Sequence, residues 1–469
     1  MKTTAASGGR NRRRIVARAA GPPPGGSGKY RLAIPAALGG AFAIMAALWL
    51  MGEQSIGLAV LRFLGIHPGP FPFLDSHAVL SAAECQARGI DVYVVNPCDV
   101  LGRVHVYSPL WLTLLPRGTT VAATPWVGAG LDLLFIAALG LLIRPRSAGE
   151  LAVLAVAAFS PATVYALERA NTDLVIFLLV LGAGLLQTRS LRRRYGSYAV
   201  LVGAALLKYY PAILLALAAR ERRRHALLVA AGTAAALAVF AAGYHDELGR
   251  ALANIPRLSH FSDSFSAQNL PFGIAEIIEL PPASAALFGF ALFAMLTAFA
   301  GARARRTVSL LGSIEIDWAA REQLFAAIGA LLIVGCFFAG QNVYYRGIYF
   351  LFVLPALVQA RFAAEAGPAR RLLSYLIAAV LFLMWGEFFR TAIDAGLHAM
   401  LPGAAGNRLA NLFWLLREFV WWWLIAGLSA VAASYIRRLP LVDDGIPWLR
   451  RRWPTDAAAL PGADRAGDK

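Results

Sequence analysis

A lysine near the middle of a long apolar segment is the residue most clearly placed to do chemistry. Lys208 lies within SYAVLVGAALLKYYPAILLALAA (residues 197–219), and arginine clusters flank this segment on both sides. A cation at membrane depth is energetically costly, so residues of this kind are usually functional. The chemistry that suits it is binding of a phosphate group. The alternative is a lysine whose ammonium extends to the membrane interface.

The two flanking clusters predict that this segment enters the membrane and returns to the same side. Basic residues favour the cytoplasmic side, and a single crossing cannot place both clusters there. Pro211 removes a backbone donor and disfavours helix at the residue before it. We therefore expect a re-entrant pair of half-helices over residues 197–219, with its turn at Lys208, Tyr209 and Tyr210.

Further polar side chains fall at the predicted exterior ends of the apolar runs. Such a set suits a lipid-linked donor, whose phosphate lies against cations at headgroup depth and whose tail occupies an apolar groove. Beside Lys208, the candidate phosphate ligands are Arg346 and Arg169. The candidate pocket residues are Tyr209, Tyr210, Glu168, Asn171, Asp173, Gln268, Asn269, Asn342 and Tyr345.

Two of these assignments have alternatives. Arg346 can instead anchor a helix end within an aromatic belt at the membrane interface. Glu168, Arg169 and Asp173 can form an internal ion-pair network that shapes the pocket without binding the donor. Arg417 and Glu418, beside a run of tryptophans, are interpreted as interface anchors rather than as a site.

The composition predicts a polytopic membrane protein. Hydrophobic residues make up 58% of the 469, charged residues 15%, and the mean hydropathy is +0.60. The net charge of +17 is concentrated in short arginine clusters between apolar runs, which indicates a role in topology rather than in binding nucleic acid. The fold class that follows is an all-α bundle of transmembrane helices.

About ten apolar runs are long enough to cross a membrane. They cover residues 32–51, 124–143, 150–167, 171–187, 226–243, 283–300, 323–339, 347–360, 372–389 and 412–435. This divides the chain into a basic cytoplasmic tail (1–31), a membrane domain (32–435) and a second cytoplasmic tail (436–469). Two long exterior loops are expected, at residues 52–123 and 244–282.

The sequence contains few signals for a cofactor or a metal. Its histidines share no metal-ligand spacing, and no glycine-rich nucleotide motif is present, which argues against a nucleotide sugar as the direct donor. We expect no cofactor and assign no metal ligands, and the sequence leaves metal dependence open. Cys85 and Cys98 fall in one exterior loop and can form a disulfide in an oxidising compartment, although sequence does not fix the pairing. Cys336 is expected to be a buried apolar residue.

Three segments resemble one family of membrane enzymes. FLDSHAVLSAAECQARGIDVYVVNPCDVLGRVHVYSPLW (73–111), ERANTDLVIF (168–177) and LLKYYPAILL (206–215) are similar to elements of GT-C glycosyltransferases that use polyprenyl-phosphate mannose, of the family-87 type. The chain departs from the usual pattern in its Ile-Asp-Val and Tyr-Ser-Pro turns and in SAQNLPFG. Donor and acceptor can therefore differ from those of the best-known members.

The resemblance implies that Asp75 is the general base. Such a carboxylate takes the acceptor proton while the lipid phosphate leaves from the opposite face of the sugar. The alternative is that Asp75 caps a helix beginning at Ser76. Asp91 and Asp99, beside Gly89 and Pro97 in the sequence, are interpreted as turn residues.

The expected function is transfer of a hexose, most simply mannose, from a polyprenyl-phosphate donor to a glycolipid or polysaccharide acceptor. The site is expected on the exterior side of the plasma (inner) membrane, with membrane lipids as the other partners and no nucleic acid. One alternative is a secondary transporter or lipid flippase, against which the sequence offers only one broken helix and no repeat. Another is a non-catalytic subunit of an envelope-assembly complex.

Overall fold

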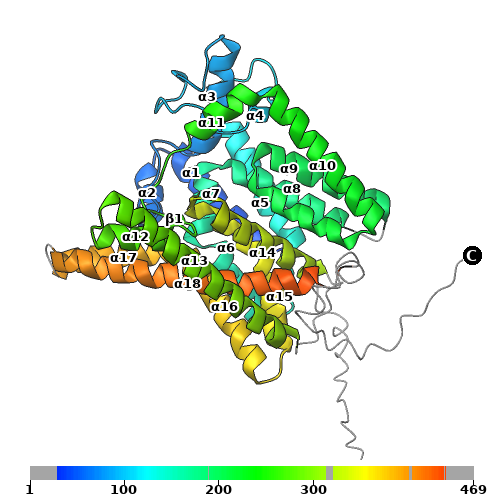
Figure 1. Ribbon diagram of the computed structural model, residues 1–469. Coiled ribbons are helices and arrows are strands. Elements are labelled where there is room, and N and C mark those ends of the chain that lie inside the picture. The colour runs from blue at the N-terminus through cyan, green and yellow to red at the C-terminus, as the bar shows by residue number, and fades with distance from the viewer. Residues whose placement is uncertain (1–28, 188–189, 313–320, 401–403, 438, 440–469) are drawn as a thin grey trace, which may run out of the picture.

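The structure, a computed structural model, describes residues 29–187, 190–312, 321–400, 404–437 and 439. The predicted tails lie almost wholly outside these residues. Helices make up nearly all the regular structure (Figure 1). Within the described ranges the strands are β1 (Ser264–Phe265) and β2 (Asn342–Val343), which form one antiparallel pair. The prediction of an all-α fold is confirmed.

Long apolar helices identify the chain as a polytopic membrane protein. Seven spans among the described residues are long and apolar enough to cross a membrane, and two bent helix pairs bring the number to nine. The seven contain α1 (Ala33–Leu50), η1 (Val121–Ala123) with α5 (Thr124–Leu142), α10 (Arg223–Gly243), α13 (Pro282–Gly312), α14 (Arg321–Ala339), η3 (Tyr344–Tyr349) with α15 (Phe350–Ala363), and α18 (Ala404–Ile436). Each of the ten predicted runs overlaps a helix, although α8 (Thr172–Leu186) has only 15 residues.

Two helix pairs are bent at short breaks. The helix axis bends by 48° between α6 (Ala148–Ala158) and α7 (Pro161–Arg169). It bends by 61° between α16 (Pro368–Met384) and α17 (Gly386–Met400). Ser160 caps α7 and Pro161 begins it, which explains the first break. The expectation of a single broken helix is therefore wrong.

The segment around Lys208 forms a hairpin. Helix α9 (Leu191–Leu207) ends at Lys208, whose backbone is extended, and the 3₁₀ helix η2 (Tyr210–Arg220) leads back alongside it. Arg194 and Glu221 form a 2.6 Å ion pair between the first turn of α9 and the residue after η2. The two ends of the segment therefore lie together, as its flanking charges predicted.

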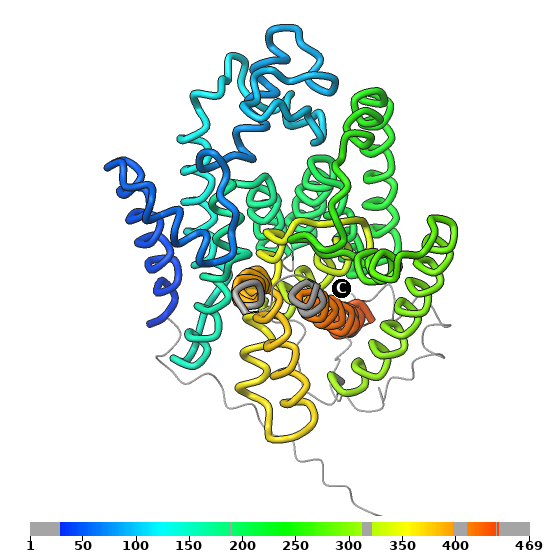
Figure 2. Tube along the Cα trace, turned by 90° about the vertical axis from the view of Figure 1, so that its left-hand side faces the viewer, coloured from blue at the N-terminus to red at the C-terminus, as the bar shows by residue number. Residues whose placement is uncertain are grey.

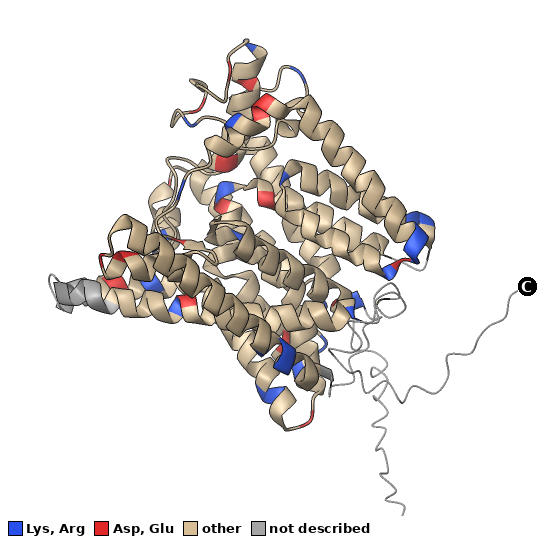
Figure 3. Ribbon diagram, viewed as in Figure 1, with Lys and Arg blue, Asp and Glu red and all other residues tan. Residues whose placement is uncertain are grey.

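The first loop, residues 52–123, forms short helices. It contains α2 (Gln54–Phe63), α3 (Leu74–Ala87) and α4 (Leu110–Leu114), and α11 (His245–Ala253) of the second loop packs against it. Helices α3, α4 and α11 lie close together at one end of the molecule, whereas α2 packs against α1 (Figures 1 and 2). A disulfide joins Cys85 to Cys98. Charged residues concentrate toward the helix ends and loops, and the helix middles are mostly uncharged (Figure 3).

The centre of the bundle is where α14 packs against α15, α18 and η2. The rings of Phe177, Phe352 and Phe325 stack there, with centroids 4.4 and 5.8 Å apart. A Cβ at Gly184 would lie 2.3 Å from the Phe325 ring, so glycine allows this close contact between α8 and α14. Cys336 is free and buried nearby, as expected. This packing holds the ends of α8, η2 and η3 next to one another.

Candidate active site

A fully buried carboxylate forms the centre of the site. Asp173 lies in the first turn of α8, and Lys208 Nζ is 2.9 Å from its Oδ1. Arg346 Nε is 3.1 Å from its Oδ2. The hydroxyls of Tyr210 and Tyr349 also donate to Oδ1. One carboxylate thus holds two cations and two phenols that come from two separate parts of the chain, the α9–η2 turn and η3 (Tyr344–Tyr349).

The two cations are placed by breaks in regular structure. Lys208 lies at the break between α9 and η2, where the extended backbone turns its side chain toward α8. Arg346 lies in η3, directly before α15. Asn342 accepts a hydrogen bond from Arg346 and donates to the carbonyl of Cys336 at 2.6 Å. The end of α14 and strand β2 therefore fix the guanidinium.

The cluster carries more positive than negative charge. Two cations share one carboxylate, so one positive charge is uncompensated within the group Asp173, Lys208 and Arg346. Lys208 is 8% exposed, and its ammonium has three donors, while Asp173 is its one ion-pair partner there. Its Nζ lies 5.5 Å from the ring centroid of Tyr107. This combination suits an incoming anion, and Asp173 holds the ammonium inside the protein.

Asp75 lies next to this cluster. It is the second residue of α3, which begins at Leu74, so the capping alternative is wrong. Its Oδ2 accepts a hydrogen bond from Asn171, and its Oδ1 lies 3.7 Å from Arg103 Nη1. The side chain is 14% exposed. Asp75 is thus held from two sides and retains contact with the surroundings.

Asn171 links the two carboxylates. Its amide nitrogen donates to Asp75, and its side-chain oxygen accepts from the backbone N–H of Asp173 at 2.8 Å, which caps α8. Ser76 donates to the carbonyl of Ala170 at 2.7 Å, so α3 is docked on the connection between α7 and α8. The helix that carries Asp75 is therefore anchored on the helix that carries Asp173.

Arg169 and Glu168 serve a different region. They pair with each other at 3.0 Å. Arg169 also donates to the carbonyl of His67, and Glu168 accepts from the N–H of Gly69. The pair holds the chain between α2 and α3. The ion-pair network predicted for Glu168, Arg169 and Asp173 is therefore split in two. Arg169 pairs with Glu168, whereas Asp173 pairs with Lys208 and Arg346.

The remaining predicted pocket residues are only partly brought together. Tyr345 is buried and packs edge-on against Tyr165. Tyr209 is 55% exposed, although its neighbour Tyr210 points into the cluster. Gln268 is exposed, and Asn269 is buried against Ser264, away from Asp173. Residues 244–282 thus contribute less than expected.

Three contacts were not anticipated from the sequence. Tyr349 follows Arg346 by three residues, and this spacing could have shown that both reach Asp173. Tyr107 lies over Lys208, and Arg103 faces Asp75. No spacing in the sequence connects these last two residues of the first loop to the site.

Arg417 and Glu418 are not interface anchors. Both are buried, at 4% and 0% exposure, and they pair at 3.0 Å. Arg417 also pairs with Glu387 at 3.2 Å and donates to the carbonyl of Ser262. Their burial follows from the packing of α17 against α18, which sequence alone does not reveal. This network holds the residues just before β1 against α18.

Asp91 and Asp99 of the first loop behave as turn residues. Asp91 accepts from the N–H of Tyr93, and Asp99 accepts from the N–H of Leu101. Burial favours the neutral form of Asp99, but hydrogen bonds and the charge of Arg103 outweigh it, so the pKa of Asp99 is lowered. Within the described part of the chain, no group of three or more His, Cys, Asp or Glu residues could hold a metal ion.

Comparison with known proteins connects this geometry to one family. No curated protein matches the chain, and no solved structure matches it. Residues 105–316, a little under half of the chain, match glycosyltransferase family 87. The matched stretch contains Asp173 and Lys208 and ends before Arg346. Over this stretch the chain is similar to glycosyltransferase family 87.

Proposed function

We propose that this protein is an integral membrane glycosyltransferase of the GT-C class that uses a polyprenyl-phosphate sugar as donor. The sugar is a hexose, with mannose the leading candidate from the sequence resemblance. The acceptor is a glycolipid or a polysaccharide. The observation that carries the proposal is the buried pair of cations, Lys208 and Arg346, beside a separate and partly exposed carboxylate, Asp75.

Each group has a role that its surroundings support. The phosphate of the donor binds Lys208 and Arg346, whose combined charge exceeds that of Asp173. Asp75 takes the proton of the acceptor hydroxyl as the oxygen attacks the anomeric carbon. The bond between that carbon and the phosphate oxygen breaks, and polyprenyl phosphate leaves with the electron pair. The cations stabilise the charge that develops on this oxygen.

We place the reaction on the exterior side of the plasma (inner) membrane. The helix that carries Asp75 also carries Cys85, which is bonded to Cys98. Disulfides persist in oxidising compartments and are rare in the cytosol. The arginine clusters support the same orientation, because Arg194 and the residues near Glu221 lie at the opposite end of the α9–η2 hairpin from Lys208.

The test is Asp75→Asn, assayed in membranes with a labelled polyprenyl-phosphate sugar. The variant keeps the shape of the side chain and removes the base, so transfer is expected to fall by at least about a hundredfold. Asp91→Asn is the matched control, because Asp91 is a half-exposed carboxylate of the same loop that pairs with Arg250. Full transfer by Asp75→Asn would remove Asp75 as the base.

A transporter or flippase is the second candidate. The two bent helix pairs favour it, because broken helices are common in transporters. The same labelled lipid separates the two functions. Movement of the intact lipid across the bilayer, with no sugar transferred to any acceptor, would support transport and contradict the transferase.

A further inference from the structure

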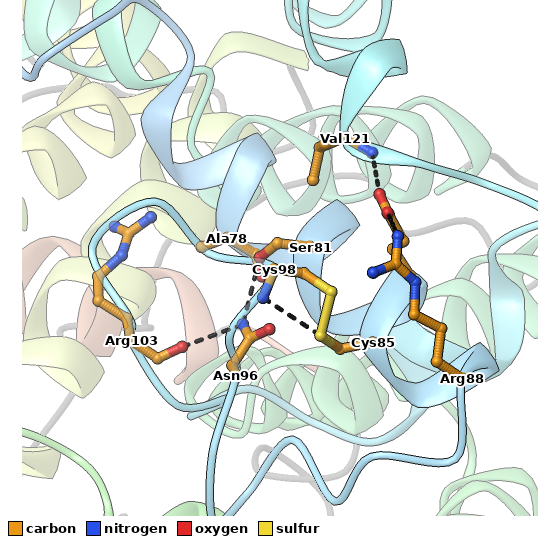
Figure 4. The surroundings of a disulfide bond; sticks show 9 residues. Ala78, Ser81, Cys85, Arg88, Asn96, Cys98, Arg103 and Val121 are labelled. Carbon is orange, nitrogen blue, oxygen red and sulfur yellow. Dashed lines mark hydrogen bonds and ion pairs between the residues drawn. A yellow bond between two sulfur atoms is a disulfide. The ribbon is translucent and has the colours of Figure 1, made fainter.

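A segment of the first loop is tied along the helix that carries Asp75. We call residues 96–103 the strap. Near the C-terminal end of α3, Cys98 of the strap is bonded to Cys85. One turn earlier, Asn96 donates from its amide nitrogen to Ser81 Oγ at 3.2 Å. Figure 4 shows both connections side by side between the strap and the helix.

The other end of the strap reaches the first turn of α3. Arg103 Nη2 donates to the carbonyl of Leu74 at 2.9 Å, and Nη1 lies 3.7 Å from Asp75 Oδ1. Asp99, whose side chain is fully buried, holds the same guanidinium at 2.8 Å. The strap is thus fixed near one end by the disulfide at Cys98, and its other end is Arg103, whose guanidinium faces Asp75.

Helix α3 is also fixed on its other sides. Glu84 accepts from the N–H of Val121 at 2.8 Å, which ties the end of α3 to the start of η1. Asn171 holds the second oxygen of Asp75. One carboxylate oxygen therefore faces Arg103 and the other faces Asn171, so rotation of the carboxylate is restricted from both sides.

We infer that the strap positions Asp75 for the transfer reaction, with Arg103 as the positioning residue and the Cys85–Cys98 disulfide as its anchor. The inference rests on the proposed role of Asp75 as the base. Opening the disulfide releases the strap and with it the contact between Arg103 and Asp75. Lys208 and Arg346 are held by Asp173 and not by the strap, so donor binding is retained. Transfer by this protein thus depends on an oxidised disulfide.

The test uses the full-length protein in lipid nanodiscs and a labelled polyprenyl-phosphate sugar. In the double variant Cys85→Ser with Cys98→Ser, kcat is expected to fall by about ten- to a hundredfold, the effect of a misplaced catalytic group. The KM for the donor should stay within about twofold, because Lys208 and Arg346 are unchanged. An unchanged kcat, or a rise in donor KM that accounts for the whole loss, would overturn the inference.

Reduction gives a matched control. Dithiothreitol should lower kcat of the wild-type protein to the level of the double variant and should leave the double variant unaffected. Both proteins contain the buried Cys336, so an effect through that thiol would appear in both. Inhibition of both proteins to the same degree would contradict a role for the disulfide.

Arg103 variants keep the disulfide and decide the case if the serine variants fail to fold. Arg103→Met should lower kcat about tenfold or more, and Arg103→Lys should restore part of it, because lysine keeps the charge but not the fork-shaped donor. Equal kcat in all three proteins would refute the positioning role. Asp75→Asn in the same assay separates the two hypotheses: full activity there removes the proposed function, whereas inactivity there with normal strap variants removes only the strap inference.

Discussion

Replacing Lys208 with methionine tests the centre of the site most directly. The substitution keeps the length and flexibility of the side chain and removes the ammonium that lies 2.9 Å from Asp173. Two separate losses are expected. The phosphate of the donor loses one of its two cations, and the buried carboxylate of Asp173 loses one of its two charged partners.

The two losses are measured by different quantities, the first by kcat and the second by the free energy of unfolding. Loss of one group that stabilises developing charge costs on the order of a hundredfold in kcat. Two unit charges at 2.9 Å attract by about 6 kcal/mol at an effective dielectric constant of about 20, before the desolvation of both groups is subtracted. Breaking a buried pair usually destabilises by about 3–5 kcal/mol. Arg346 remains beside Asp173, so the lower value is expected here.

A second substitution separates the two losses. Adding Asp173→Asn to Lys208→Met removes the uncompensated carboxylate, so the melting temperature should recover. Activity should not recover, because the phosphate still lacks its ammonium. The assays are initial rates in nanodiscs with labelled donor and the melting temperature of the same preparations. Recovery of kcat in the double variant would show that Lys208 only neutralises Asp173, and it would refute phosphate binding by this residue.

Three further predictions concern stability. Burial lowers the pKa of His105 to about 4, below its ordinary 6.5. As the pH falls from about 6.5 to 4, only the unfolded state gains a proton, so the free energy of unfolding falls by up to about 3 kcal/mol. Between about pH 7 and about pH 4.5 the melting temperature should therefore fall less in His105→Phe than in the wild type. Arg194→Met leaves Glu221 buried without its 2.6 Å partner and should lower the melting temperature. Adding Glu221→Gln to this variant should restore part of the loss. An unchanged melting temperature in Arg194→Met would show that the ion pair does not stabilise the α9–η2 hairpin. Arg417→Leu should destabilise by about 3 kcal/mol or more, measured as reduced melting temperature, and a wild-type value would show that its network contributes little.

The helices and the hairpin were largely predictable from the sequence. Apolar length identifies a membrane helix because burial of the backbone in lipid requires one. The hairpin followed from a second constraint, since arginines on both sides of residues 197–219 had to lie on one side, and the ion pair of Arg194 with Glu221 brings those ends together. The bent pairs were missed because hydropathy averages over breaks of one or two residues.

The site was predictable in its residue types and not in its partners. Lys208 stood out because a lysine in an apolar segment is unusual. Its partner Asp173 lies in another helix, and a polar residue at a helix start fits several roles equally well. Arg169 and Arg346 both follow polar residues near apolar runs, yet only one turns toward Asp173. The difference arises from the docking of α3 and η3, which no local pattern encodes.

The carboxylate shared by Lys208 and Arg346 has a consequence for selectivity. Because Asp173 already neutralises one of the two cations, a small soluble anion meets a single net positive charge and gains little by binding. A ligand with a long hydrocarbon chain brings additional free energy from apolar contacts, which does not depend on displacing Asp173. Inorganic phosphate should therefore compete poorly with the donor, whereas polyprenyl phosphate should compete well.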